Sequence, residues 1–460
     1  MLTKIAERVL LVGVGLKPPG LRPRGLGPDG PMGPSGRTVE DSLSELRGLV
    51  ETAGAVVAGT VSQSVTRYHP GTLIGSGKVL EVAQMAREVS ARTVILDADL
   101  SPAQQKTLEK ATDSKVIDRT RLILDIFAKR AKTSEGRLQV ELAQLSYLLP
   151  RLTGAWRSFS QQVGGIGTRG PGERKLEYER RHIQSRITRL KSEIEKVKAR
   201  RQVQRSRRLS IPVPLVAIIG YTNVGKSTLL NALLSQASRV ASPPRGGASI
   251  GGADEGARSR FVYADDKLFA TLDPTTRRVR LPDGTHVVAT DTVGFIRRLP
   301  TALVAAFRST LEEAGLADCL LVVTDATAPD FSAQDSAVDA VLDELGAGAV
   351  PRVEVFNKTD LVSPERRREL ALSHPGRTLI SAVTGEGISA ALDRVQEILS
   401  RRWLLRELDL PHGAGRFASV IYASSQVIKE THDGTMVRYR MRVTAENWER
   451  LRALTRQYFC

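Results

Sequence analysis

A glycine-rich loop between an expected strand and an expected helix is the feature that most limits how this chain can fold. Residues 215–219 are apolar, residues 220–227 read GYTNVGKS, and residues 228–234 are typical of a helix. The spacing G-x-x-x-x-G-K-S lets backbone N–H groups converge on an anion, lets the lysine reach the β- and γ-phosphates, and lets the serine coordinate Mg²⁺. A chance match in a glycine-rich turn would lack the flanking strand and helix. The sequence therefore predicts a nucleoside triphosphate site formed by Gly220, Tyr221, Thr222, Asn223, Val224, Gly225, Lys226 and Ser227.

A second apolar run, residues 286–291, ends in Asp291, Thr292, Val293 and Gly294. An aspartate at the end of such a strand can hold Mg²⁺ through water, and the glycine lets a backbone N–H approach a γ-phosphate. Taken alone, this D-x-x-G pattern also fits a simple turn after a strand. Because the D-x-x-G motif follows the glycine-rich loop in the chain, it predicts the part of the site that contacts the third phosphate.

Two further segments predict which base is bound. The run 353–357 ends in Asn357, Lys358, Thr359 and Asp360, and the run 378–380 is followed by Ser381, Ala382 and Val383. A carboxylate at Asp360 can accept both N–H groups of a guanine edge, and a backbone N–H after the second run can meet the guanine O6. All four motifs lie at the carboxyl ends of expected strands, where open α/β sheets bind ligands. We predict a GTPase domain of the P-loop class with a mostly parallel sheet.

The charge of the chain indicates a polyanionic partner. The 460 residues suit roughly three domains of ~100–200 residues each. Their formal net charge is +17 and the sequence pI is about 10.1, which favours RNA as a partner, with a solvated basic surface as the alternative. No apolar stretch reaches the ~20 residues of a membrane span. Residues 8–14 are too short and too strand-like for a signal peptide, and they lie so close to Met1 that we expect no transit peptide. We expect a cytoplasmic protein.

Positive charge is concentrated in residues 173–208, where fourteen Lys and Arg stand against five Glu. Apolar residues recur there at helical spacing, at Leu176, Ile183, Ile187, Leu190, Ile194 and Val197. A similar seam precedes it, at Leu138, Leu142, Leu145, Leu149 and Leu152. Two such seams bury each other as an antiparallel helical hairpin. The loop between them, residues 153–172, is either a flexible linker or a glycine-rich tip that contacts RNA through Trp156, Arg157, Phe159 and Arg169.

Smaller domains are expected on both sides of these segments. The first part of the chain predicts a small, mostly parallel α/β domain, with strands at 9–14, 55–61, 93–96 and 115–117 and helices at 39–51, 77–88 and 102–111. After the GTPase segment, residues 410–415 read as a linker. A small β-rich domain with a closing helix is expected after it, with strands at 417–421, 427–432 and 436–443 and the helix at 445–457.

Five segments of the chain have a distinctive sequence: YHPGTLIGSGK at 68–78, RLILDIFAKRAKTSEGRLQVELAQ at 121–144, GGIGTRGPG at 164–172, GYTNVGKS at 220–227 and LFATLDP at 268–274. In these segments, and over nearly its whole length, the chain resembles the HflX family of ribosome-associated GTPases. The resemblance implies an α/β multidomain protein. Its parts are an N-terminal α/β domain (1–132), an antiparallel coiled-coil hairpin with a glycine-rich tip (133–210), a Ras-like P-loop G domain (211–405) and a small α+β C-terminal domain (406–460). Residues 242–259 look like an insertion in the G domain.

The resemblance also implies an activity. GTP would be hydrolysed to GDP and phosphate by a monomer that binds the large ribosomal subunit and its rRNA, with splitting or rescue of stalled ribosomes or a role in subunit biogenesis. Association with ribosomes, or peripherally with a membrane, is implied as well. The resemblance further implies a nucleotide-sensing segment formed by Phe269, Ala270, Thr271, Leu272 and Asp273. The implied Mg²⁺ ligands are Ser227 and Thr271, with Asp291 acting through water.

Phe295 follows Gly294, at the place where Ras-like enzymes have a water-orienting glutamine. A phenyl ring cannot polarise water, so we expect slow intrinsic hydrolysis. Lys226, Thr271 and Asn223 are the expected catalytic residues, with Asn223 helping to hold K⁺ against the phosphates. Two other functions stay open, an RNA-remodelling enzyme that uses any nucleotide and an RNA-binding scaffold. The intact nucleotide motifs disfavour the scaffold.

Overall fold

The structure is a computed structural model that describes residues 6–16, 39–154, 171–209, 213–240, 269, 274–296, 314–329 and 331–456. The chain divides into two compact units. The first comprises residues 1–195, 266–269 and 298–307, and the second comprises 196–265, 270–297 and 308–460. The predicted insertion at 242–259 lies outside the described residues.

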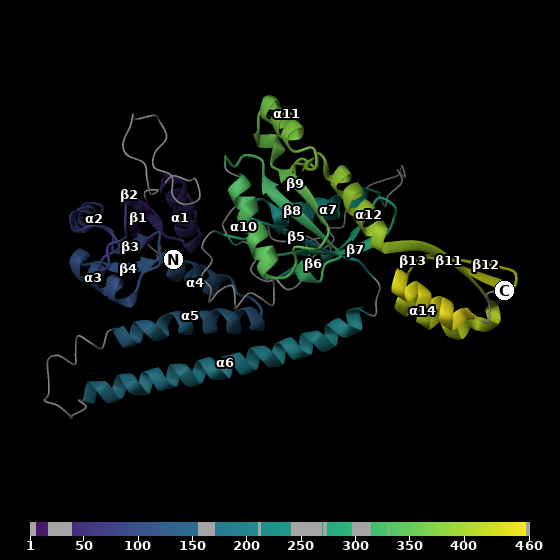
Figure 1. Cartoon of the computed structure of the whole chain (residues 1–460), viewed down its shortest axis with the longest axis horizontal. Helices are drawn as coiled ribbons and strands as arrows, with labels where there is room; N and C mark the ends of the chain where they lie inside the picture. The colour runs from purple at the N-terminus through teal and green to yellow at the C-terminus, as the bar shows by residue number, and fades with distance from the viewer. Residues whose placement is uncertain are drawn as a thin grey trace, which may run out of the picture. The chain divides into compact units, whose positions relative to one another are not determined.

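The first unit contains a four-stranded parallel sheet in the order β2-β1-β3-β4 (Figure 1). Its strands are β1 (Arg8–Leu16), β2 (Val56–Val65), β3 (Thr93–Leu96) and β4 (Lys115–Asp118), and its helices are α1 (Val39–Ala53), α2 (Ser76–Glu88), α3 (Pro102–Thr112) and α4 (Arg119–Arg130). β3 is buried along its whole length and β1 along most of it, as expected for parallel strands covered by crossover helices. The predicted alternation of strands and helices is confirmed.

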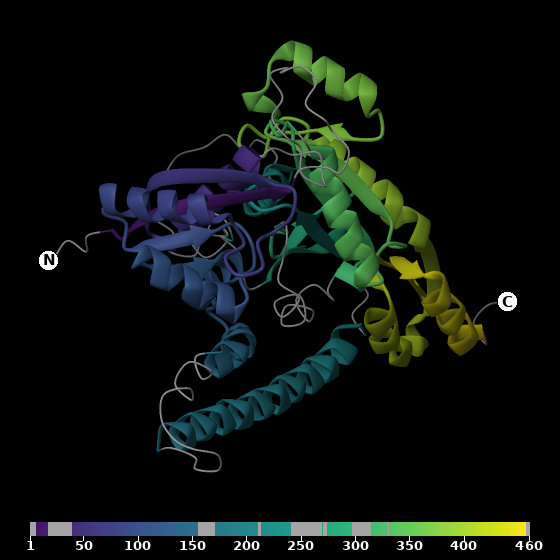
Figure 2. The same cartoon turned by 60° about the vertical axis from the view of Figure 1, so that its left-hand side comes forward.

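Two long helices follow, α5 (Ser134–Gly154) and α6 (Pro171–Leu209). They run side by side in opposite directions, which confirms the predicted hairpin (Figure 1). Leu190 of α6 is fully buried, and Arg186 of α6 donates to Glu141 of α5 at 2.8 Å. Helix α6 is 39 residues long. Figure 2 shows it as one unbroken helix. The predicted tip residues, from Trp156 to Arg169, lie outside the described residues.

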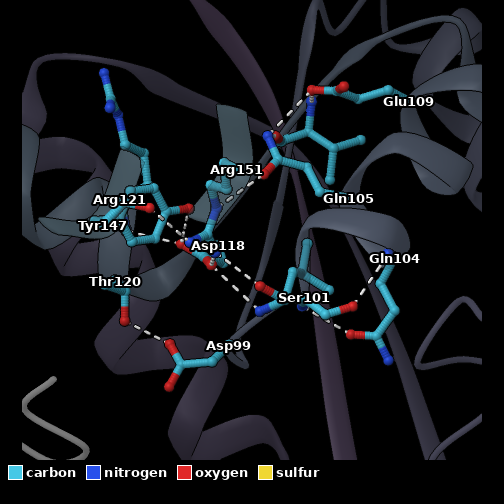
Figure 3. A network of polar contacts seen from close by, with 12 residues as sticks. Asp99, Ser101, Gln104, Gln105, Glu109, Asp118, Thr120, Arg121, Tyr147 and Arg151 are labelled. Atoms are coloured by element: carbon cyan, nitrogen blue, oxygen red, sulfur yellow. Dashed lines mark hydrogen bonds and ion pairs between the residues drawn. The ribbon is translucent and has the colours of Figure 1, made fainter. Parts of the chain in front are cut away.

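A buried carboxylate at the end of β4 anchors α5 to the sheet. The Asp118 side chain is wholly buried and accepts hydrogen bonds from the N–H groups of Arg121 (2.8 Å) and Leu100 (3.2 Å). It also accepts from the Tyr147 hydroxyl (2.8 Å) and the Arg151 guanidinium (2.8 Å), both on α5 (Figure 3). The Arg151 guanidinium covers the Tyr147 ring at 3.4 Å from its centroid. Burial raises the pKa of Asp118, although its donors favour the charged form. The network holds the last two turns of α5 against the sheet.

The second unit contains a six-stranded sheet in the order β10-β9-β8-β5-β7-β6. All neighbouring pairs are parallel except β6 and β7. The strands are β5 (Leu215–Gly220), β6 (Thr275–Arg280), β7 (His286–Asp291), β8 (Cys319–Asp325), β9 (Arg352–Asn357) and β10 (Thr378–Leu379). The helices are α7 (Lys226–Val240), α10 (Phe331–Glu344), η1 (Thr359–Leu361), α11 (Pro364–Ser373) and α12 (Ile388–Arg402). The predicted mostly parallel sheet is confirmed.

The topology of this sheet creates a binding edge. β5 lies between β7 and β8, so the strands that follow it in the chain lie on both of its sides. β5, β7, β8 and β9 are parallel, and their carboxyl ends therefore share one edge of the sheet. Ligands of open α/β sheets bind at this kind of edge, beside the strand where the order reverses.

A three-stranded antiparallel sheet in the order β11-β13-β12 ends the second unit. Its elements are β11 (Trp403–Pro411), η2 (His412–Phe417), α13 (Ala418–Ser424), β12 (Gln426–Asp433), β13 (Met436–Thr444) and α14 (Ala445–Thr455). The helices cover one face of the sheet through a buried cluster that includes Ile421, Tyr439, Met441, Val443 and Leu451.

The prediction of a linker at residues 410–415 is wrong. Leu410 and Pro411 end β11, which begins directly after α12. Leu408 and Leu410 are buried and stand on either side of Asp409, which is the alternation of a strand with one covered face. The proline and the glycines that follow it hid this strand in the sequence.

The prediction of a strand at residues 417–421 is also wrong, because this segment enters helix α13. Phe417, Val420 and Ile421 are spaced as on one helical face, and all three pack on the core of the C-terminal sheet. A short apolar run of this kind does not distinguish a strand from a buried helix.

Among the helices that the structure describes, none combines the length and the apolar composition that crossing a membrane requires.

Candidate nucleotide-binding site

The glycine-rich loop joins the end of β5 to the start of α7. Gly225 has a φ of +89°, and a Cβ there would lie 2.5 Å from Asn357 Nδ2, so only glycine fits. Asn223 also has a positive φ, 63°, which asparagine tolerates better than most residues. The Val224 carbonyl oxygen accepts a hydrogen bond from Asn357 Nδ2 at 2.8 Å. The loop is therefore tied to the end of β9 immediately before the helix begins.

Lys226 is the buried cation of this site. Its Nζ donates to the carbonyl oxygens of Gly220 (3.0 Å) and Tyr221 (2.6 Å). Burial lowers the pKa of Lys226 to about 8, and the nearby Asp291 partly opposes this. Gly294 lies against the lysine, since a Cβ at that position would be 2.8 Å from Nζ. A buried ammonium that points into a loop at a helix start is suited to bind an anion, because a phosphate would stabilise its charged form.

Two oxygen ligands for a divalent cation lie beside the lysine. Ser227 Oγ donates to Asp291 Oδ2 at 2.6 Å, and Asp291 is fully buried at the end of β7. Hydroxyl and carboxylate oxygens are the donors that Mg²⁺ prefers, so these residues fit that ion. Thr271, the other predicted ligand, lies outside the described residues, as do Ala270, Leu272 and Asp273.

The residues after β7 pack back onto the loop. Thr292 Oγ1 donates to the Ile218 carbonyl oxygen at 2.7 Å. The Phe295 N–H donates to the Gly220 carbonyl oxygen at 3.1 Å, and the Phe295 carbonyl oxygen accepts from the Thr222 N–H at 2.7 Å. The Phe295 ring is buried, with the residue 2% exposed. The ring therefore serves packing, and it offers no polar group to an attacking water.

The other half of the site lies at the ends of β9 and β10. Asn357 Oδ1 accepts a hydrogen bond from the Ala382 N–H at 2.9 Å, so this N–H is engaged by the protein. Asp360 is exposed, and its Oδ1 accepts from Ser381 Oγ at 2.6 Å. Val383 is 78% exposed. A carboxylate oriented by a hydroxyl and open to solvent can receive the paired N–H groups of a base.

Asp325 joins this half of the site, although no predicted motif contains it. It ends β8, and its Oδ2 lies 2.7 Å from Lys358 Nζ. Lys358 has a φ of 64°, a conformation that few lysines adopt without such support. The signal in the sequence was a carboxylate at the carboxyl end of an apolar run, at the same edge as the other motifs.

The loop, D-x-x-G and N-K-x-D motifs thus meet at one sheet edge of the second unit. Predicted residues that are buried there include Tyr221, Thr222, Val293, Thr359 and Ser381. Phe269 instead groups with the first unit, where its ring meets Phe127 of α4 edge-on, with 4.5 Å between the ring centroids. Its contact with a nucleotide stays a prediction.

Three family models match consecutive parts of the chain. Residues 40–128 match the N-terminal region of a GTP-binding GTPase, and residues 130–208 match the middle region of such a GTPase. Residues 215–246 and 256–358 match a model described as a 50S ribosome-binding GTPase.

Similar proteins align over most of the chain. The GTPase HflX of Caldanaerobacter subterraneus subsp. tengcongensis is 44% identical over 90% of this chain and 90% of its own. The GTPase HflX of Escherichia coli K12 is 41% identical over 89% of this chain and 92% of its own. A solved GTP-binding protein from Sulfolobus solfataricus, in complex with GDP, covers 86% of this chain and 99% of its own, at 20% identity and a TM-score of 0.43. On the identity and coverage of the two HflX proteins, this chain belongs to the HflX family of P-loop GTPases, which bind and hydrolyse GTP.

Proposed function

We propose that this GTPase works on the large ribosomal subunit, where it splits or rescues stalled ribosomes or assists subunit biogenesis. The observation that carries the proposal is the basic helix α6, which contains all fourteen Lys and Arg of residues 173–208 and only five Glu. Ribosomal RNA is a polyanion whose phosphates attract such a surface. The description of the matched model as a 50S ribosome-binding GTPase supports this partner. We expect a cytoplasmic monomer.

In the proposed cycle, the residues of the sheet edge hold the nucleotide. Lys226 binds the β- and γ-phosphates and Asp360 reads the guanine edge. GTPases of this family generally use Mg²⁺, which would neutralise charge on the phosphate oxygens when bound. Ser227 would hold it directly and Asp291 through water, with Thr271 as a third contact in the triphosphate state. Four working parts are proposed, with bounds at 1–132, 133–210, 211–405 and 406–460.

Cosedimentation with purified ribosomal subunits tests the partner. The full-length protein is pelleted with large subunits, small subunits or intact ribosomes, in the presence of GDP or of a non-hydrolysable GTP analogue. We expect binding to large subunits that depends on the triphosphate. Absence of pelleting under every condition would refute the ribosomal function. Lys226→Ala is the matched control, because it should abolish nucleotide binding and with it the difference between the two nucleotides. Micromolar nucleotide affinity in this variant would contradict the site assignment.

We also propose that Asn223 helps to hold K⁺ against the phosphates, since Phe295 stands where a glutamine would orient the attacking water. Asn223 is an exposed residue of the glycine-rich loop and has a φ of 63°. Hydrolysis should be faster in K⁺ than in Na⁺ buffers, and Asn223→Ala should remove the difference. Equal wild-type rates in the two salts would exclude this role.

A further inference from the structure

One face of α6 points away from the seam with α5. Its members recur at helical spacing and are all exposed: Tyr178, Arg181, His182, Ser185, Arg189 and Ser192. The opposite face consists of side chains that are buried or half-buried: Ile183, Arg186, Ile187, Leu190 and Ile194. We call the six exposed residues of the first set, from Tyr178 to Ser192, the outer face of α6.

Arg181 and Arg189 give the outer face its positive charge, and none of its six members is acidic; Glu179, in the same stretch of the helix, is half-buried. Glu177 and Glu193 lie at its borders, where they accept hydrogen bonds from Arg181 Nε (3.0 Å) and Arg189 Nε (2.9 Å). These are exposed i,i+4 pairs, and Arg181 and Arg189 are 75% and 72% exposed. Such pairs are weak, and a guanidinium bonded through Nε has four further N–H donors for a phosphate. The face therefore complements a polyanion.

Tyr178 is the large aromatic side chain of this face. It is 71% exposed, and its ring lies nearly parallel to that of His182, with 6.4 Å between the centroids and 16° between the planes. A single exposed apolar side chain on a surface needs no explanation. Tyr178 differs because its ring stacks against the neighbouring His182 ring and because it lies among exposed arginines. Unpaired RNA bases bind to this combination, by stacking on an aromatic ring while cations hold the phosphates.

We propose that Tyr178 is a stacking platform for an unpaired RNA base, and that Arg181 and Arg189 bind phosphates of the same strand. Tyr178 and Arg189 are ~16 Å apart along the helix axis, at ~1.5 Å per residue, so both can contact one short single-stranded segment. Each nucleotide of a single strand carries a phosphate for the arginines and a base for the ring, so one RNA segment uses both kinds of group. The inference rests on the proposed function, because it names the kind of RNA structure that the hairpin recognises.

The test measures the affinity of the full-length protein for a short single-stranded RNA and for the corresponding duplex, by fluorescence anisotropy at several KCl concentrations. Tyr178→Ala should weaken binding of the single strand about 5- to 30-fold without changing the dependence on salt, because stacking involves no phosphate. Tyr178→Phe should bind like the wild type. Arg181→Gln should lower the slope of log affinity against log salt by about 0.7, as expected for one lost phosphate contact to a single strand.

Leu372→Ala is the matched control, since Leu372 of α11 is equally accessible, at 83% exposure. It should bind both RNAs as the wild type does. Wild-type affinity in Tyr178→Ala, or an equal loss for single strand and duplex, would overturn the stacking platform while leaving ribosome binding intact. If the wild-type protein binds neither RNA nor large subunits, the proposed function fails and this inference fails with it. Because Tyr178 is exposed, its variants should melt at the wild-type temperature, which a thermal scan verifies.

Discussion

Lys226 allows the nucleotide site to be tested without measuring catalysis. Its ammonium is buried against two carbonyl oxygens, and burial lowers its pKa to about 8. Bound phosphates place negative charge beside Nζ and stabilise its protonated form, which raises the pKa in the complex. Nucleotide binding above neutral pH should therefore take up a proton from solution.

The size of this effect follows from the free-state pKa. With a pKa of about 8, roughly 0.1 of the molecules lack the Lys226 proton at pH 7 and roughly 0.75 lack it at pH 8.5. Because the protonated form binds, the contribution of Lys226 to affinity should change little at and below pH 7 and should be about 4-fold weaker at pH 8.5. A group whose pKa falls on binding would have the opposite effect. Nucleotide binding would then release a proton, and the affinity would rise with pH.

Isothermal titration calorimetry with GDP measures both quantities. Titrations at pH 7 and pH 8.5, in two buffers with different heats of ionisation, give the number of protons taken up. Both pH values lie below the pH at which guanine itself ionises. Uptake should rise from about 0.1 to about 0.75 proton per nucleotide. Lys110→Gln, which removes an exposed lysine of α3, should behave as the wild type. Uptake near zero at both pH values would show that Lys226 does not meet the phosphates, or is not depressed in the free protein.

Three further changes have defined outcomes. Asp360→Asn should weaken guanine nucleotides about 10- to 100-fold, because an amide cannot accept both the ring N1–H and the exocyclic N2–H of guanine. The same amide can donate to the oxygen that xanthine carries at C2, so xanthine nucleotides should be favoured; an unchanged preference in competition binding counts against this role. Arg442, 9% exposed, pairs with Asp283 between β6 and β7, so Arg442→Met should lower the free energy of unfolding by about 1–3 kcal/mol. Denaturant unfolding of the single and double variants tests this pair. If the losses in the free energy of unfolding caused by Arg442→Met and Asp283→Asn simply add in the double variant, the two side chains are not coupled. Arg151→Ala leaves Asp118 buried without its cation and should cost about 2–4 kcal/mol, seen as faster hydrogen exchange in α5; wild-type protection there would contradict the anchor.

The sheet edge was predictable because its motifs are local and strand ends are fixed by topology. Once residues 215–219 and 286–291 are strands of one parallel sheet, Gly220 and Asp291 must lie at the same edge. Asp325 was predictable on the same argument, since it ends β8. No motif contains it, so motif spacing alone passes over it.

The anchor of α5 was not predictable. The leucines at 138, 142, 145, 149 and 152 suggest the buried face of this helix, but all five are only half-buried. The buried side of α5 instead carries Gln139, Val140, Ala143 and Tyr147. Two of these four have polar groups, and their burial depends on partners such as Asp118, 29 residues from Tyr147 in the chain. The spacing of apolar residues in a sequence indicates where two helices pack against each other. It does not reveal a polar helix face that is buried against a sheet.

The strand pair β6–β7 connects the nucleotide site to the C-terminal sheet. At its far end Asp291 accepts a hydrogen bond from Ser227, which fixes it to the phosphate loop. At the near end the β6–β7 turn is held from two sides. Asp283 pairs with Arg442 of β13, and the His286 carbonyl oxygen accepts from Gln426 of β12 at 3.2 Å. β6 and β7 pair without a register shift from Thr275 to Arg280, so one unbroken ladder of hydrogen bonds joins the two ends. The Ser227–Asp291 hydrogen bond and the contacts at Asp283 and His286 therefore lie at opposite ends of the same strand pair.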